Sequence, residues 1–228
     1  MSERTLDRIG AMCGILWLPL ELAAFLLVSR NTPAGGLTSE REIVRILTAS
    51  PPNQAWAGEY LSALAALFFL VFTTRLWAVL WRAEGGRGWL SVSVLGAGFV
   101  YVALKFPQHA ALHVLWTRAG HGLDVQSGSV LWDTYQDLLF ASLYFNALMT
   151  AATAVVVLRK LALPRWLGWT AIACSVLLLA GTVTHEFAFA LPFGFWVMAA
   201  GVVLFRRSDP PQASDRAVTL PAAGASSV

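Results

Sequence analysis

Hydrophobic positions along this chain of 228 residues gather into six long runs, separated by short polar or basic segments. An apolar stretch of about 20 residues is long enough to cross the roughly 30 Å hydrocarbon core of a bilayer as a helix. The pattern therefore predicts an all-α polytopic membrane protein, a six-helix transmembrane bundle. The runs cover residues 9–29, 57–81, 89–116, 130–158 and 166–183, and the sixth ends at Phe205.

Two segments lie outside the predicted spans. Residues 30–56 form the longest connection, and Ser39 followed three residues later by Glu42 is a capping box, which predicts a short helix on the membrane surface. Residues 208–228 are rich in proline, alanine and serine, which predicts a disordered cytoplasmic tail. The predicted organisation is one six-span domain, residues 1–207, followed by this tail.

The composition agrees with a bilayer environment. Hydrophobic residues make up 57% of the chain and charged residues 13%, against roughly 25% charged in a soluble domain. The net charge of +3 is spread over the turns between the runs and forms no basic patch. This distribution favours the lipid bilayer as the partner and argues against nucleic acid.

The basic residues also predict an orientation. Outside the runs, ten Lys and Arg residues lie on the side that holds both termini and four on the other. Cytoplasmic loops carry the excess of Lys and Arg. The protein is therefore predicted to lie in the cell membrane with both termini on the cytoplasmic side. The ten are Arg4, Arg8, Arg82, Arg87, Arg159, Lys160, Arg165, Arg206, Arg207 and Arg216, and the four are Arg30, Arg41, Arg45 and Arg118.

Ionisable residues concentrate in the half of the spans that this orientation places outside. Charged side chains are costly in hydrocarbon, so they are expected to face the interior and to pair. We therefore predict a polar pocket open to the extracytoplasmic side, with an ion pair between Glu21 and Lys105. The pocket candidates are Glu21, Lys105, His109, His113, Asp133, Asp137, His185 and Glu186.

The third and fourth runs predict how some of these groups meet. A loop of 13 residues, 117–129, joins them, so the two helices are expected to be antiparallel neighbours. Counted from the loop, His113 and Asp133 lie at one depth, and His109 and Asp137 at a greater depth. The match predicts His109 and Asp137 at the centre of the pocket, with the other two residues nearer the water.

Other patterns bear on ligands and packing. His109 and His113 stand one helical turn apart, as metal ligands can, but without the glutamate of the His-Glu-x-x-His zinc motif. A bis-histidine haem would place either of them opposite His185, and nothing in the sequence requires this. No cofactor is predicted. The spacing of Gly10 and Gly14 predicts helix packing within the chain in preference to a dimer face.

Three classes of function remain open on this basis. A non-catalytic binding, sensory or accessory membrane protein is favoured, because no complete catalytic set is present. The second class is a membrane enzyme acting on a lipophilic small molecule, with His109 and Asp137 as acid and base. The third is a small permease, for which the chain lacks visible inverted repeats. The oligomeric state is left open.

Two segments carry a family resemblance. Arg-Leu-Trp-Ala-Val-Leu-Trp-Arg-Ala-Glu-Gly at 75–85 and Leu-Arg-Lys-Leu-Ala-Leu-Pro-Arg-Trp-Leu-Gly-Trp at 158–169 frame two inner turns. With the runs around them, they resemble a broad group of bacterial six-helix integral membrane proteins catalogued as a domain of unknown function. The resemblance covers roughly the second to fifth runs. It implies a six-helix membrane fold and brings no catalytic residues.

Overall fold

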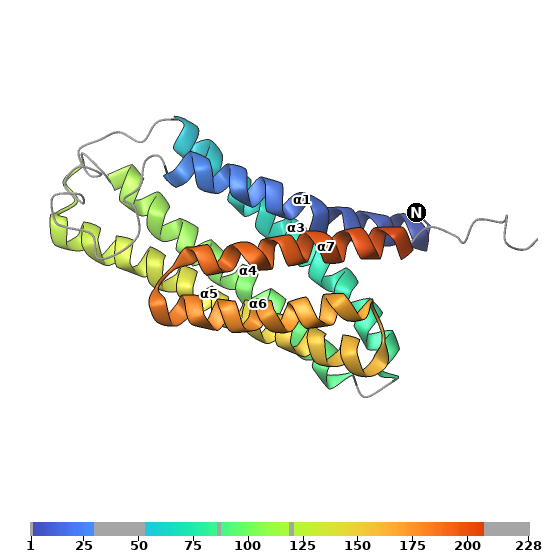
Figure 1. Ribbon diagram of the computed structural model, residues 1–228. Helices are drawn as coiled ribbons and strands as arrows, with labels where there is room; N and C mark the ends of the chain where they lie inside the picture. The colour runs from blue at the N-terminus through green and yellow to red at the C-terminus, as the bar shows by residue number, and fades with distance from the viewer. Residues whose placement is uncertain (1, 30–52, 86–87, 119–120, 208–228) are drawn as a thin grey trace, which may run out of the picture.

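The computed structural model describes residues 2–29, 53–85, 88–118 and 121–207. Within these ranges the chain is helical, contains no strand, and has six helices long and apolar enough to cross a membrane (Figure 1). The predicted all-α six-helix bundle is confirmed. The elements are α1 (Glu3–Ser29), α3 (Asn53–Glu84), α4 (Trp89–Arg118), α5 (Val125–Lys160), α6 (Arg165–Thr184), the 3-10 helix η1 (Phe187–Ala190) and α7 (Leu191–Arg207). The predicted surface helix at Ser39 and the tail at 208–228 lie outside the described residues.

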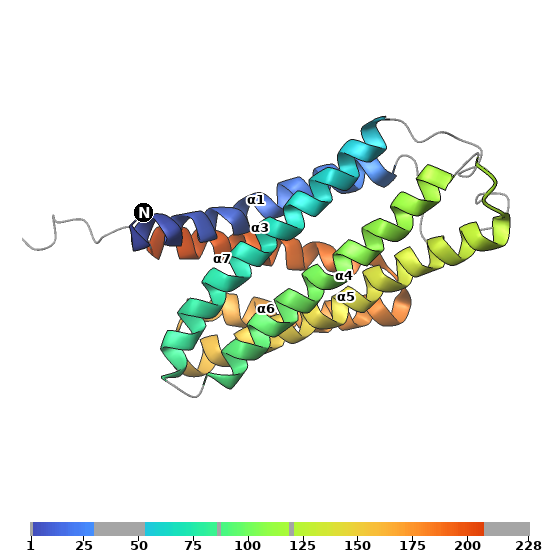
Figure 2. The same cartoon turned by 180° about the vertical axis from the view of Figure 1, so that it is seen from behind.

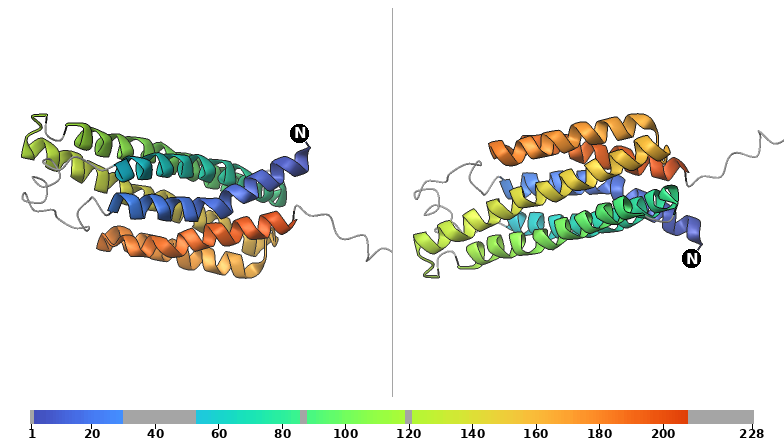
Figure 3. Two further views of the ribbon diagram at one scale, coloured as in Figure 1. Left: turned by 90° about the horizontal axis from the view of Figure 1, so that it is seen from above. Right: turned by 90° about the horizontal axis from the view of Figure 1, so that it is seen from below.

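The six helices form a closed ring in chain order. Each helix packs on the next, and α7 packs on α1. Figure 3 shows α6 and α7 along one side of the bundle and α3 and α4 along the opposite side. The start of α1, the α3–α4 and α5–α6 connections and the end of α7 gather at one end, here called the basic end (Figure 1). The opposite end, where α1 and α4 finish and α3 and α5 begin, is called the loop end.

The helices differ in length, and the difference appears at the loop end. The 36 residues of α5 span about 54 Å at about 1.5 Å per residue, well beyond a hydrocarbon core of about 30 Å. The 20 residues of α6 span about 30 Å. The α4–α5 hairpin accordingly extends past the turn between α6 and α7 (Figure 2). In α5 the residues before Leu138 belong to this extension.

The start of α5 is set by its own sequence. Asp124 has an extended backbone, and its carboxylate accepts hydrogen bonds from the backbone N–H and the hydroxyl of Ser127, both at 2.8 Å. These bonds satisfy a donor that the first helical turn leaves unpaired. They also lower the pKa of the Asp124 carboxyl below its ordinary value, because they stabilise its charged form.

An aromatic cluster fills the middle of the ring. Phe69 of α3 is fully buried, and its ring contacts Trp17 of α1, Tyr101 of α4 and Phe193 of α7, with centroids 5.1, 4.7 and 6.0 Å away. Aromatic pairs at these separations add to the stability gained by burial. The interior is therefore packed solid at this level. A second, smaller apolar core near the loop end contains Val28, Ala55, Leu112, Leu115, Trp116 and Trp132.

Small residues bring α1 close to its neighbours. A Cβ at Gly10 would lie 2.7 Å from the Cβ of Arg75, and one at Gly14 would lie 2.3 Å from the Phe72 ring. Both glycines thus face α3 of the same chain, as the sequence predicts. The guanidinium of Arg75 lies 2.7 Å from the carboxylate of Asp7, so this intramembrane charge is paired at the basic end of α1.

Candidate functional site

A layer of polar side chains separates the two apolar cores. On α1, Glu21 lies between Trp17 of the main core and Val28 of the second core. Helices α3, α4 and α5 likewise contribute residues to both cores, with polar residues between them along the helix. Apolar packing above and below the layer limits its access to water, so its groups depend on one another for hydrogen bonds. This polar layer comprises Glu21, Glu59, Ser62, Lys105, Gln108, His109, His113 and Tyr135.

An ion pair forms the deepest part of the polar layer. The ammonium of Lys105 lies 2.5 Å from Oε1 of Glu21, and the two side chains are 6% and 19% exposed. The same ammonium lies 5.8 Å from the centroid of the Tyr101 ring, within the range of a cation–π contact. The predicted Glu21–Lys105 pair is confirmed, and it ties α1 to α4.

A hydrogen-bond chain extends from this pair through Ser62 to His109. The hydroxyl of Ser62 donates to Oε2 of Glu21 at 3.1 Å, and Nε2 of His109 lies 3.1 Å from that hydroxyl oxygen. A hydroxyl has a single hydrogen, so Nε2 of His109 must be the donor in the second bond. The neutral imidazole then carries an acceptor at Nδ1. This buried atom has no hydrogen-bond partner among the described residues.

Glu59 and His113 form the part of the layer nearest the loop end. Oε2 of Glu59 lies 3.7 Å from Nδ1 of His113, which is too long for a good hydrogen bond. The Glu59 residue is 8% exposed, whereas the His113 side chain is 50% exposed and stands edge-on to the Trp56 ring. The layer therefore runs from a half-exposed imidazole inward to a buried ion pair.

Gln108 and Tyr135 complete the layer between α4 and α5. The side chain of Tyr135 on α5 lies near that of Gln108 on α4, and Gln108 is 2% exposed. Oε1 of Gln108 has no partner within the described part of the chain, and neither has Nε1 of the adjoining Trp132.

The layer thus holds more unpaired acceptors than unpaired donors. Three of its buried acceptors have no hydrogen-bond partner among the described residues: Oε2 of Glu59, Oε1 of Gln108 and Nδ1 of His109. Oε2 of Glu59 has only the long ion-pair contact with His113, and Nε1 of Trp132 is one unpaired donor of the neighbouring apolar core. Buried polar atoms in proteins are paired in the great majority of cases, so each exception calls for an explanation. Within the described residues, acceptors therefore outnumber donors among the unpaired atoms of the layer.

The predicted contact between His109 and Asp137 is not formed. His109 faces Ser62 on α3, and both Asp133 and Asp137 are exposed side chains of α5. Matched depth fixes the height of a residue along its helix and leaves open the direction in which it points. The face of α5 that meets the core here carries Trp132. The prediction is therefore corrected: these two aspartates lie on the outside of the hairpin, before the uninterrupted apolar part of the run that begins at Leu138.

His185 and Glu186 lie at the turn between α6 and η1. His185 ends α6 with a left-handed backbone, φ 55°, and its ring contacts Phe140 of α5 at 4.9 Å. Both residues are exposed. In the ranges that the structure describes, no hydrogen bond or ion pair joins either of them to the polar layer.

The two histidines of α4 point to different partners, His109 to Ser62 and His113 to Glu59 and Trp56. Among the described residues, no group of three or more His, Cys, Asp or Glu side chains is placed to hold a metal ion. The pair on α4 accordingly has no third ligand there.

Sequence reasoning missed Glu59, Ser62, Gln108 and Tyr135 as members of the site. A usable signal was present, because Glu59 and Ser62 are three residues apart and share one face of α3. Likewise, Gln108 follows Lys105 by three residues on α4. The neutral side chains were passed over because serine and glutamine carry no charge that must be paired.

Fold and polar layer together define the class: an all-α bundle of six helices, each long and apolar enough to cross a membrane, with ionisable groups enclosed between four of them. Comparison of the chain with protein-family models, curated proteins and solved structures finds no match.

Proposed function

We propose that this chain is a multi-pass membrane protein with a non-catalytic binding or sensory role, and that its ligand binds in the polar layer. The observation that supports this is the set of three buried acceptors, on Glu59, Gln108 and His109, that have no hydrogen-bond partner in the described part of the chain. The alternative of acid–base catalysis by His109 and Asp137 loses its support, because Asp137 is exposed on the outside of α5.

The proposed ligand is a small molecule that carries several N–H or O–H donors. A protonated amine matches best, since Glu59 offers a carboxylate and the other two acceptors are neutral. Hydrogen bonds that involve a charged group contribute about 1.5–3 kcal/mol each, more than neutral ones. The imidazole of His113, half exposed beside Glu59, marks the side from which the ligand enters.

The proposed location is the bacterial cytoplasmic membrane with the basic end in the cytoplasm. The resemblance to bacterial six-helix membrane proteins supports the choice of membrane, and the ten-to-four distribution of Lys and Arg supports the orientation. The loop end would then face the outside, and the polar layer would be reached from the extracytoplasmic side.

The orientation predicts which positions an impermeant thiol reagent labels on intact cells. Gln126→Cys at the loop end should be labelled, and Arg165→Cys at the basic end should be labelled only after the cells are opened. Both positions are exposed, and the native Cys13 and Cys174 are buried, so background labelling is expected to be low. The reverse pattern would show that the protein has the opposite orientation.

If the polar layer binds a ligand, the unpaired acceptors should contribute more to holding that ligand than to the stability of the fold. Methylammonium chloride should raise the melting temperature of the purified protein above the value in equal sodium chloride, because a ligand that binds only the folded state stabilises it. Glu59→Gln and His109→Gln should each weaken this binding at least tenfold, which corresponds to the loss of about 1.4 kcal/mol. The measurement is thermal unfolding against amine concentration, with native mass spectrometry to detect any small molecule that co-purifies.

The matched control is Asp137→Asn, which removes a carboxylate of the same hairpin outside the polar layer. This variant should keep the amine response of the original protein. If Glu59→Gln and His109→Gln keep the response or any retained molecule and only lower the melting temperature, the polar layer is a structural device that holds α1, α3 and α4 together.

A further inference from the structure

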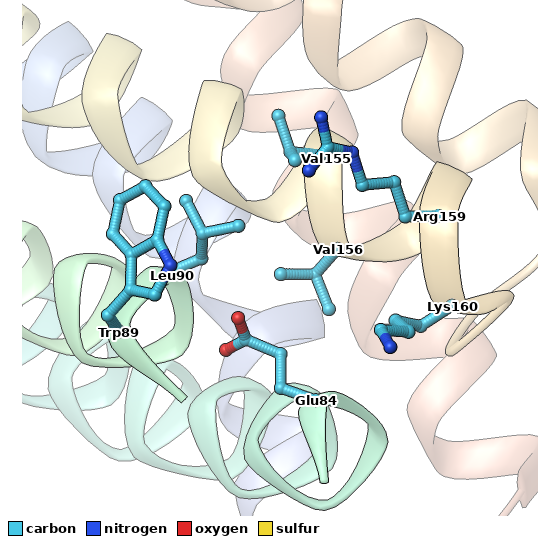
Figure 4. A pocket seen from close by; sticks show the side chains of 7 residues that line it. All are labelled: Glu84, Trp89, Leu90, Val155, Val156, Arg159 and Lys160. Atoms are coloured by element: carbon cyan, nitrogen blue, oxygen red, sulfur yellow. The ribbon is translucent and has the colours of Figure 1, made fainter. Parts of the chain in front are cut away.

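A cleft of 130 Å³ lies at the basic end, away from the polar layer and independent of its proposed role (Figure 4). It opens where the end of α3, the start of α4 and the end of α5 meet. One part of its wall is apolar and another is charged, which is the character of a site for an amphiphile. Its lining residues are Glu84, Trp89, Leu90, Val155, Val156, Arg159 and Lys160.

The charged groups around the cleft have opposite signs but do not pair with each other. Oε2 of Glu84 accepts hydrogen bonds from the backbone N–H of Ser91, at 2.8 Å, and from the Ser91 hydroxyl. Figure 4 shows the Glu84 carboxylate pointing between Trp89 and Val156. Arg159 and Lys160 are exposed, and the structure, over the residues it describes, shows no ion pair between either of them and Glu84. An acid and two bases thus border one cleft without an ion pair between them in the described residues, and Oε1 of Glu84 is not used by the Ser91 bonds.

The position of the cleft along α5 matches the headgroup level of a bilayer. The part of the apolar run 130–158 that follows Asp137 extends from Leu138 to Leu158, and its length of about 30 Å equals the hydrocarbon core. Arg159 and Lys160 follow at once. Trp89, 67% exposed, lies at the mouth of the cleft, as tryptophans do at membrane interfaces. Basic pockets between membrane helices are known to bind phospholipid headgroups.

We propose that this cleft binds the headgroup of a phospholipid that carries a primary amine, of the phosphatidylethanolamine type. Its phosphate would lie between Arg159 and Lys160, and its ammonium would donate to the Glu84 carboxylate. Leu90 and Val155 would contact the start of an acyl chain. A headgroup with a phosphate and no amine would pair with the two bases, but it would give the Glu84 carboxylate no positive partner. A choline headgroup has no N–H to donate to Glu84.

The test is native mass spectrometry of the full chain in detergent with equal amounts of dioleoyl phosphatidylethanolamine, phosphatidylcholine and phosphatidylglycerol. We expect at least threefold more bound ethanolamine lipid than either of the others. Glu84→Gln should abolish the preference for ethanolamine over choline lipid. The double variant Arg159→Gln, Lys160→Gln should reduce binding of all three.

The control is Arg165→Gln, which removes an exposed positive charge at the same end without touching the cleft. It should leave the lipid preference unchanged, and circular dichroism of every variant should show that the helices persist. Preferred binding of phosphatidylglycerol, or equal binding of all three lipids, would overturn the proposal. Displacement of the lipid by an equal concentration of soluble glycerophosphoethanolamine would also overturn it, because the site would then not depend on acyl chains.

Discussion

Replacing Lys105 by Met, or Glu21 by Gln, is expected to destabilise the bundle by about 3–5 kcal/mol, because each change leaves the other charge buried without its partner. The ion pair is 2.5 Å long, and the Lys105 side chain is only 6% exposed. After Lys105→Met, the carboxylate of Glu21 retains the hydroxyl of Ser62 and loses its countercharge. After Glu21→Gln, the ammonium of Lys105 is left facing an amide.

The double variant Glu21→Gln, Lys105→Met should recover much of this loss, since it removes both charges together. Replacing a buried ion pair by uncharged groups of similar size is often close to neutral. The measurement is reversible unfolding in detergent, with all four proteins compared as a double-mutant cycle. If the double variant is as unstable as the sum of the two single variants, the two residues do not stabilise each other. Asp137→Asn, at an exposed position of α5, serves as the control and should change stability by less than about 0.5 kcal/mol.

The fold could be predicted from the sequence because membrane spans depend on length and composition, which are local properties. The same holds for the pair of Glu21 and Lys105. Both are charges in long apolar runs at comparable depth, and the cost of an unpaired charge leaves few alternatives. Both features could be predicted because each depends on one large free-energy cost, that of exposing apolar residues to water or of leaving a charge unpaired in hydrocarbon.

The rest of the site depends on how each helix is rotated about its axis, which no single strong term in the sequence fixes. On α5, Asp137 is close to the face that packs against α4, but its side chain points outward. It lies in the part of the hairpin that extends past α6, where no neighbouring helix of the described ranges covers it. Conversely, Glu59 is buried although it lies near the start of α3, where it faces His113, whose ring contacts Trp56. Packing between helices settles these directions, and it involves residues distant in sequence.

The contact between α7 and α1 that closes the ring depends on Gly201. Its substitution should cause the second large loss of stability. A Cβ at Gly201 would lie 2.9 Å from the backbone oxygen of Ala11 and 2.9 Å from the backbone nitrogen of Ile15. Backbone atoms of a helix cannot rotate away, so the two helices would have to separate. We expect Gly201→Ala to cost about 1–3 kcal/mol, as overpacking does, even though alanine is the better helix former.

Alanine substitutions at two other glycines show how the cost depends on which atoms the added methyl group contacts. At Gly194 the Cβ would approach the end of the Leu18 side chain at 2.5 Å, which a rotamer change can relieve, so Gly194→Ala should cost less than Gly201→Ala. At Gly96 no atom of the described residues lies within 4 Å of the added Cβ, and Gly96→Ala should raise stability by up to about 1 kcal/mol through helix propensity alone. Unfolding of the three variants in one detergent gives the order. If Gly201→Ala is as stable as Gly96→Ala, α7 does not pack against the backbone of α1 as closely as the structure shows, and the ring is open between them.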